Sequence, residues 1–361
     1  MPAGRVSLLA TIQEYSYTEL QGLTCSDISV KKLRSLCEST WGSSPCLWQI
    51  RIAFMILKGK TDVICVARTG AGKSLTFYLP LLVRKNGIII VVVPLNALAS
   101  EMAATLATFG INAIALTASN SNRKSFKVSL DLMVQNLYRR LTFFKDIEDL
   151  KYRVVVTNPE TLLDKKGRLL RLLKEPVFFR HVICVIIDEA HCVVNWGTFR
   201  PEYKEMGLLR FILPSTIPLY LVSATLPPAT LHTIRRLLHI RDDACEVIMS
   251  NDRPNVSIMV RKITHGLNTY WDLAFLVPQG WKPGDAKPML FLVMFDSIRI
   301  LQEALEFLRR RLAKEHRRMI LPFHSEMSEE HRVETIKLMK TGSILGVCAS
   351  EGFGLVSRKY L

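Results

Sequence analysis

Short runs of aliphatic residues alternate with longer amphipathic stretches along the first two thirds of the chain. The runs are almost continuous in Val and Ile, as is typical of strands covered on both faces. They lie at residues 62–67, 87–93, 153–157, 181–187 and 218–223. The stretches between them, such as 74–83 and 95–109, have helical periodicity. Strands that alternate with helices predict a parallel sheet with crossover helices on its faces.

A change of composition divides this first region from a second one. Residues 251–284 are richer in Pro, Gly and polar residues and predict a connection between two lobes. A new alternation of strands and helices then begins and continues to the end of the chain. We therefore predict an α/β protein with two parallel-sheet lobes, the second incomplete. The predicted parts are an N-terminal arm at 1–26, a first lobe at 27–250, the connection at 251–284 and a partial second lobe at 285–361.

The charge of the chain favours a polyanionic partner. Lys and Arg number 48 against 32 Asp and Glu, which gives a formal net charge of +16. Charge alone does not separate nucleic acid from an anionic membrane surface or from a simple solubility charge. The eight cysteines form no CxxC pair, so a zinc site has no support. Without a signal peptide or an apolar stretch long enough to span a bilayer, we expect a soluble intracellular protein with no membrane partner.

A glycine-rich turn follows the first predicted strand and precedes a predicted helix. Residues 67–74 are Ala-Arg-Thr-Gly-Ala-Gly-Lys-Ser, and the glycines allow backbone N–H groups to surround a phosphate at the positive end of the helix. Lys73 is expected to reach the β- and γ-phosphates of ATP, and Ser74 to hold Mg²⁺. The predicted ATP-binding residues of this turn are Thr69, Gly70, Ala71, Gly72, Lys73 and Ser74.

Two adjacent acids follow a later aliphatic strand, at the end where parallel sheets bind their ligands. Asp188 is suited to contact Mg²⁺, and Glu189 is suited to orient and deprotonate the attacking water. With His191 they form an Asp-Glu-Ala-His box. Together with Lys73, these three residues are the predicted catalytic set, and Ser74 and Asp188 are the predicted metal ligands.

This motif set resembles the superfamily 2 helicases, and more closely the RecQ family of DNA helicases, over residues 33–355. The resemblance implies that Gln49 contacts the adenine of ATP. It implies that the elements at 91–98 and 156–160, with Pro94 and Asn158, contact the nucleic-acid backbone. The Ser-Ala-Thr element, with Ser223 and Thr225, is similar to the one that couples hydrolysis to strand movement in these helicases.

The segment after the acid box resembles the aromatic loop with which the RecQ family contacts single-stranded DNA. It contains Trp196, Phe199 and Tyr203, whose rings offer faces on which bases stack, and Arg200, which offers a phosphate contact or a stacking cation. The alternative is that these aromatic residues pack into the core beneath the sheet. The resemblance favours the contact with DNA.

The resemblance implies two RecA-like lobes with ATP and Mg²⁺ between them, and ATP-dependent unwinding of DNA with 3′-to-5′ movement. It also implies that the protein is classed as a hydrolase and isomerase, lies in the nucleus and takes part in DNA repair and recombination. The pattern fails after residue 355, and the motif that supplies an arginine finger has no counterpart. A missing finger can lower the rate of phosphoryl transfer by about 10³- to 10⁵-fold.

Three alternatives stay open at this stage. The first is a catalytically weak DNA-binding fragment that responds to ATP. The second is an RNA helicase, since the phosphate loop and the acid box occur there too. The third is a phosphate-loop enzyme unrelated to nucleic acid, which leaves the net charge and residues 223–225 without an explanation.

Overall fold

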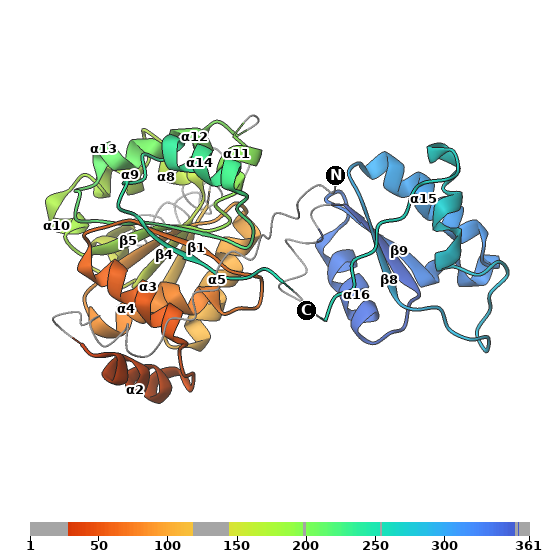
Figure 1. Cartoon of the computed structure of the whole chain (residues 1–361), viewed down its shortest axis with the longest axis horizontal. Coiled ribbons are helices and arrows are strands. Elements are labelled where there is room, and N and C mark those ends of the chain that lie inside the picture. The colour runs from red at the N-terminus through yellow and green to blue at the C-terminus, as the bar shows by residue number, and fades with distance from the viewer. Residues whose placement is uncertain (1–27, 118–143, 198–199, 253–254, 351–352, 354–361) are drawn as a thin grey trace, which may run out of the picture. The chain divides into compact units, whose positions relative to one another are not determined.

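The computed structural model describes residues 28–117, 144–197, 200–252, 255–350 and 353 (Figure 1). Its internal contacts divide the chain into two units, Met1–Arg253 and Pro254–Leu361. The predicted arm at 1–26 lies outside the described residues, and so does Phe199 of the aromatic loop. The predicted end of the first lobe, residue 250, lies three residues before the division.

The first unit contains a sheet in which every pair of neighbouring strands is parallel. Within the described residues the strand order is β3-β4-β2-β5-β6-β1-β7. The strands are β1 (Val63–Val66), β2 (Ile88–Val92), β3 (Ala113–Leu116), β4 (Val154–Thr157), β5 (Val182–Ile187), β6 (Leu219–Ser223) and β7 (Cys245–Ile248). All five strands predicted from aliphatic runs are present, and the parallel α/β prediction is confirmed.

Helices cover both faces of this sheet (Figure 1). One face packs against α3 (Leu47–Lys58), α4 (Lys73–Val83) and α5 (Asn96–Thr108), with α2 (Val30–Trp41) outside α3 and α4. The opposite face packs against short helices. They are α8 (Pro159–Leu162), α9 (Arg168–Leu172), α10 (Pro176–Phe179), α11 (Cys192–Asn195), α12 (Glu202–Glu205), η1 (Met206–Leu208), α13 (Leu209–Ile212) and α14 (Pro228–Leu237).

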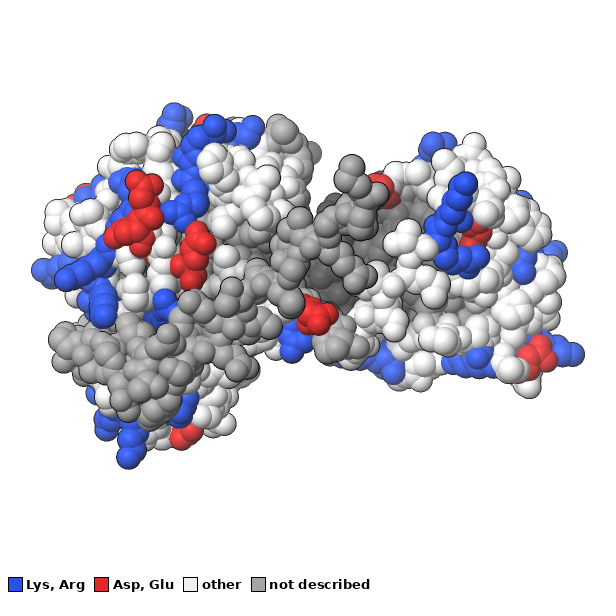
Figure 2. Space-filling model, viewed as in Figure 1, with Lys and Arg blue, Asp and Glu red and all other residues white. Residues whose placement is uncertain are grey.

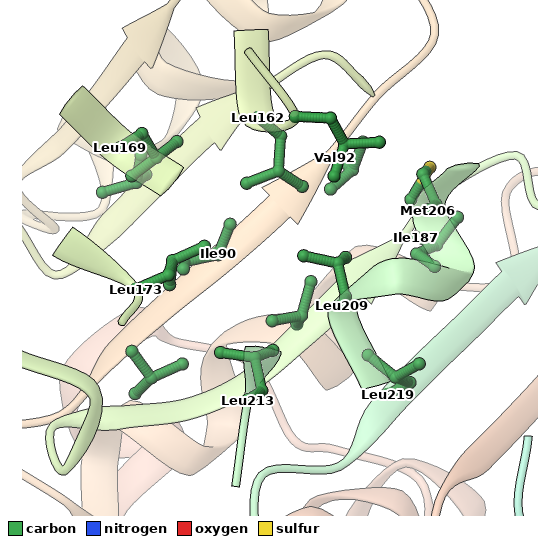
Figure 3. Packing of buried hydrophobic residues seen from close by; sticks show 14 of the residues in the cluster. Ile90, Val92, Leu162, Leu169, Leu173, Ile187, Met206, Leu209, Leu213 and Leu219 are labelled. Carbon is green, nitrogen blue, oxygen red and sulfur yellow. The ribbon is translucent and has the colours of Figure 1, made fainter. Parts of the chain in front are cut away.

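The alternation of side chains along each strand supplies both of these cores. In β1, Val63 and Cys65 face α3 and α4, whereas Ile64 faces the short helices. Figure 3 shows the second core, where Ile90, Val92 and other strand residues meet leucines of the short helices. Because both faces are covered, nearly every strand position is buried and aliphatic, which explains the continuous runs in the sequence.

The second unit has a smaller parallel sheet of order β8-β10-β9 within its described residues. One face is covered by α15 through residues such as Leu301, Leu305 and Leu308, and α16 packs on β9 and β10 through Ile336. The elements are η2 (Leu267–Thr269), η3 (Trp271–Leu276), β8 (Phe291–Phe295), α15 (Ile298–Arg310), η4 (Lys314–Met319), β9 (Ile320–Phe323), α16 (Glu329–Lys340) and β10 (Gly346–Ser350).

Serine residues fix the starts of three of the longer helices. The side chains of Ser29, Ser297 and Ser328 each accept a hydrogen bond from the backbone N–H three residues later, which satisfies one otherwise unpaired donor of the first turn. Among the described residues, no helix is both long and apolar enough to cross a membrane.

Asp62 is a buried carboxylate at the amino end of β1. Its side chain has no exposed surface; it accepts hydrogen bonds from the backbone N–H of Leu219 and Arg241 at 2.9 Å each and from the guanidinium of Arg210 at 2.5 Å. Removing one partner of such a buried ion pair destabilises the fold, because the remaining charge stays buried without an opposite charge beside it.

We therefore expect Asp62→Asn to lower the free energy of unfolding by about 3 kcal/mol. The matched control is Asp149→Asn, since Asp149 is exposed on the same unit and should change stability by less than about 0.5 kcal/mol. Urea unfolding followed by circular dichroism measures both variants. Equal midpoints would show that the buried carboxylate does not stabilise the first unit.

Candidate functional site

Three predicted motifs lie at the same edge of the large sheet. The glycine-rich turn follows β1, the acid box follows β5, and Ser223 ends β6. In the sheet, β6 lies between β5 and β1, so a single strand separates the turn from the acid box. Carboxyl ends of parallel strands share one edge, which is where ligands of α/β sheets bind. The structure therefore brings the two predicted halves of the ATP site together.

The glycine-rich turn has the backbone conformation that its sequence predicts. Gly70 and Gly72 have φ angles of 84° and 82°, in the left-handed region that favours glycine, and Gly72 is the N-cap of α4. The ammonium group of Lys73 lies back over the turn, donating to the carbonyl oxygens of Ala67 at 2.8 Å and Arg68 at 3.2 Å. The lysine thus already points into the loop that is expected to surround the phosphates.

Gln49, the predicted adenine contact, is attached to this turn. Its Nε2 donates to the carbonyl oxygen of Gly72 at 2.9 Å, and its Oε1 accepts from the backbone N–H of Cys46 at 2.7 Å. A β-carbon at position 72 would lie only 2.8 Å from Nε2 of Gln49. The glutamine therefore holds the turn against the start of α3, a role that the sequence did not predict. Its contact with adenine stays a prediction.

The second residue of the acid box is strained. Glu189 has a φ angle of 50° and is buried, and its backbone N–H donates to Oδ1 of Asp188 at 2.9 Å. A non-glycine residue in the left-handed region stores strain, and such residues cluster at functional sites. The hydrogen bond from Ala190 N–H to the carbonyl oxygen of Val222 holds the turn against β6.

His191 connects the acid box to the Ser-Ala-Thr element. Its Nδ1 lies 2.9 Å from Oγ of Ser223 and 3.5 Å from Oε2 of Glu189. Ser223 Oγ in turn donates to the carbonyl oxygen of Thr225 at 3.0 Å and lies 3.2 Å from the Thr225 N–H. Glu189, His191, Ser223 and Thr225 thus form one continuous set of polar contacts.

The electrostatics of a buried thiol show that Lys73 and Asp188 act on the same region. Burial raises the pKa of Cys65 to about 11, while the positive charge of Lys73 lowers it and the negative charge of Asp188 raises it. Burial also raises the pKa of Tyr78 on α4, and Asp188 adds to this shift. The carboxylate of Asp188 is therefore close enough to α4 to influence its side chains.

The donor set at this edge fits Mg²⁺ bound together with a triphosphate. Ser74 is exposed at the start of α4 and Asp188 is half-buried at the end of β5, and both carry oxygen donors. Mg²⁺ prefers oxygen ligands and commonly takes only one or two from the protein, with phosphates and water completing its shell. Within the described residues, no group of three or more His, Cys, Asp or Glu side chains is placed to hold a metal ion.

The predicted backbone-contact elements are joined to each other. Asn158 is buried and caps α8, accepting from the N–H of Thr161 at 2.8 Å, while its Nδ2 donates to Oδ1 of Asn96 at 2.6 Å. Asn96 begins α5, directly after the segment that contains Pro94. The sequence did not predict this link, because the two asparagines are 62 positions apart.

Arg200 is held by internal contacts from three directions. Its Nε and Nη2 donate to the two carboxylate oxygens of Glu160 at 2.6 and 2.8 Å, and its Nη1 donates to the carbonyl oxygen of Pro94 at 2.7 Å. The guanidinium carbon lies 5.3 Å from the centre of the Trp196 ring and 4.9 Å from that of Tyr203. The arginine thus fastens the aromatic loop to the two predicted backbone-contact elements.

The two described aromatic residues of this loop differ in exposure. Trp196 is half-buried, but Tyr203 is only 1% exposed and belongs to the core beneath the sheet. The rings meet edge to face with centroids 6.1 Å apart. In this arrangement Tyr203 has no ring face on which a base could stack, and it packs beneath Trp196 and Arg200. Tyr203 is therefore a core residue, as the alternative interpretation of the aromatic loop expected.

Basic side chains are scattered over both units in the view of Figure 2, and acidic side chains lie among them on the first. Two arginines of the second unit have internal partners. Arg309 donates to the carbonyl oxygen of Ile320 and Arg311 to that of Val277. On the face shown in Figure 2, the basic side chains of the described residues are not gathered in one patch.

Comparisons with known proteins place this geometry among helicases. The family model described as "DEAD/DEAH box helicase" matches residues 48–234. The chain is 32% identical over 215 residues to ATP-dependent DNA helicase Q-like 2 of Arabidopsis thaliana, covering 59% of this chain and 28% of that protein. It is 25% identical over 327 residues to a putative ATP-dependent RNA helicase of Acanthamoeba polyphaga mimivirus, covering 90% of this chain and 53% of that protein.

Among solved structures, the crystal structure of the helicase MrfA bound to DNA and AMPPNP is similar in fold. The TM-score is 0.55 at 16% sequence identity, and the match covers 92% of this chain and 45% of that one. This likeness concerns the fold alone and agrees with the two parallel-sheet units. The chain spans between about a quarter and about a half of the length of these relatives.

Proposed function

Because the chain belongs to the DEAD/DEAH box helicase family, we propose that it is an ATP-dependent DNA helicase similar to the RecQ family, with 3′-to-5′ movement on DNA. The observation that carries the proposal is the continuous set of contacts from Glu189 through His191 to Ser223, beside the glycine-rich turn. Relatives described as RecQ helicases, about 30% identical over more than half of the chain, support DNA as the substrate.

Each residue of the site has a distinct task in ATP hydrolysis. Lys73 and the N–H groups of the turn bind the β- and γ-phosphates. Ser74 and Asp188 would hold Mg²⁺, which when bound offsets the negative charge of the phosphates. Glu189 is placed to orient the attacking water and to take its proton. His191 connects Glu189 to Ser223. Through these contacts, a movement of Glu189 that accompanies hydrolysis would displace the Ser-Ala-Thr element.

DNA binding is proposed for the surface around the aromatic loop. Trp196 offers a partly exposed ring, and Pro94 and Asn158 lie in the two elements that Arg200 and Asn96 hold together. Arg200 acts chiefly by holding this surface in place. A nuclear location and roles in repair and recombination belong to the same proposal and are supported by the resemblance alone.

RNA is a second candidate substrate. The relative from Acanthamoeba polyphaga mimivirus, which matches over 90% of this chain, is described as a putative RNA helicase. Competition between single-stranded DNA and RNA of the same base sequence for stimulation of ATP hydrolysis distinguishes the two. Preferential stimulation by RNA would overturn the assignment to DNA. ATP-responsive binding with hydrolysis near background would instead indicate the weak DNA-binding module.

Two substitutions test the chemistry of the site. Lys73→Ala should abolish ATP binding or turnover, because the phosphates lose their side-chain cation.

Glu189→Gln should retain ATP binding but lower hydrolysis by at least about 100-fold, because the water loses its base. Binding of a fluorescent ATP analogue and steady-state phosphate release measure these effects separately. Parental hydrolysis by Glu189→Gln would show that another group is the base.

Arg200→Lys tests the support of the DNA-binding surface. Lysine keeps the charge but cannot make the paired contact with Glu160, so DNA-stimulated hydrolysis should fall about tenfold, and more than hydrolysis without DNA. Glu160→Gln should give a similar loss. The matched control is Arg171→Lys, since Arg171 is exposed and, among the described residues, donates to backbone carbonyls of its own segment. Equal losses with and without DNA would contradict the proposed role.

A further inference from the structure

A buried polar contact lies behind the phosphate-binding turn, on the face of the sheet that α4 covers. Tyr220 of β6 has no exposed surface, and its hydroxyl lies 2.7 Å from Oγ1 of Thr76 in α4, which is also fully buried. The ring of Tyr220 packs edge to face on Phe77, with centroids 5.8 Å apart. All neighbouring positions of β6 before Ser223 are aliphatic, so Tyr220 places a lone hydroxyl within this strand.

The donors and acceptors in this contact can be assigned. Thr76 Oγ1 donates to the carbonyl oxygen of Lys73 at 2.6 Å, which uses its only proton. The hydroxyl of Tyr220 must then donate to Thr76. The result is a directed chain from the hydroxyl of Tyr220 through that of Thr76 to the backbone carbonyl oxygen of Lys73.

This chain joins two elements of the phosphate site, β6 and α4. Thr76 follows the glycine-rich turn by two residues, and Tyr220 belongs to the strand that ends in Ser223. A buried hydroxyl without a partner destabilises the fold, so the hydroxyls of Tyr220 and Thr76 hold each other in a single arrangement. The first turn of α4, which carries Lys73 and Ser74, is thereby held against β6 on the face of the sheet that α4 covers.

We infer that Tyr220 is a positioning residue for the phosphate site, which sets the first turn of α4 relative to the strand that carries the Ser-Ala-Thr element. The inference rests on the proposed function, because it assigns Lys73 to the phosphates of ATP. β6 then holds the site at two points. Tyr220 fixes the lysine end through Thr76, and Ser223 fixes the acid box through His191.

Tyr220→Phe removes the hydroxyl and keeps the ring. We expect the KM for ATP, and the Kd for a fluorescent methylanthraniloyl derivative of ATP, to rise about two- to tenfold, the loss of one net hydrogen bond, with kcat changed less. Tyr152→Phe is the matched control, because Tyr152 is half-buried before β4, at the opposite edge of the sheet. It should leave both constants unchanged.

Substitutions at Thr76 provide a second test of the same contact. Thr76→Val should raise the KM at least as much as Tyr220→Phe, whereas Thr76→Ser, which keeps the hydroxyl, should stay near the parent. The double variant Tyr220→Phe with Thr76→Val should bind no more weakly than Thr76→Val alone, because both substitutions break one chain. Urea unfolding of each variant without nucleotide separates loss of stability from loss of affinity.

The outcomes separate this inference from the function on which it rests. Failure of the parent to bind the ATP analogue would overturn both. Parental binding with an unchanged KM and Kd in a folded Tyr220→Phe would overturn the inference alone, and so would full additivity of the two substitutions. Should Tyr220→Phe fail to fold, the contrast between Thr76→Ser and Thr76→Val decides, and equal constants for these two reject the positioning role.

Discussion

The position of β6 between β1 and β5 is the constraint on which the site depends. Parallel strands end at one edge, and the central strand of the three contacts both of its neighbours. Its last residue accepts from the backbone N–H of Ala67 through its carbonyl oxygen and contacts His191 through its hydroxyl. The residue at that one position, Ser223, therefore contacts the phosphate turn through its backbone and the acid box through its side chain. An added strand between β1 and β5 would move them about 5 Å further apart.

Three residues at the same edge have a left-handed backbone conformation. Gly70, Gly72 and Glu189 all have positive φ angles, and glycine removes most of the cost for the first two. Glu189 keeps its side chain and bears the strain of a left-handed conformation. The hydrogen bonds made by the N–H groups of Glu189 and Ala190 hold it there. Because the residue is buried, the rigidity of the surrounding sheet is what keeps its carboxylate in one place.

Much of the fold could be predicted because strands covered on both faces must be aliphatic throughout, and such runs stand out in a sequence. The phosphate turn could be predicted for a similar local reason, since its glycines, lysine and serine act within eight residues. The contacts of Gln49 with Gly72, of Asn158 with Asn96 and of Arg200 with Glu160 could not. Each joins residues 23 to 62 positions apart, and no local pattern specifies such pairs. Tyr203 shows the same limit. The sequence of an aromatic loop looks the same whether a given ring is exposed for binding or is buried and supports the loop from the core.

The pairing of Arg200 with Glu160 also limits how the aromatic loop can contact a nucleic acid. While the carboxylate is bound, the pair has no net charge and attracts a phosphate weakly. Three of the five N–H donors of the guanidinium are already used, and the rings of Trp196 and Tyr203 lie against it. A phosphate contact through Arg200 would need the pair to open, at the cost of leaving Glu160 without its partner beside a polyanion. Base stacking on Trp196 needs no such change. The arrangement therefore favours stacking as the first contact of this loop, with Arg200 keeping the ring in position.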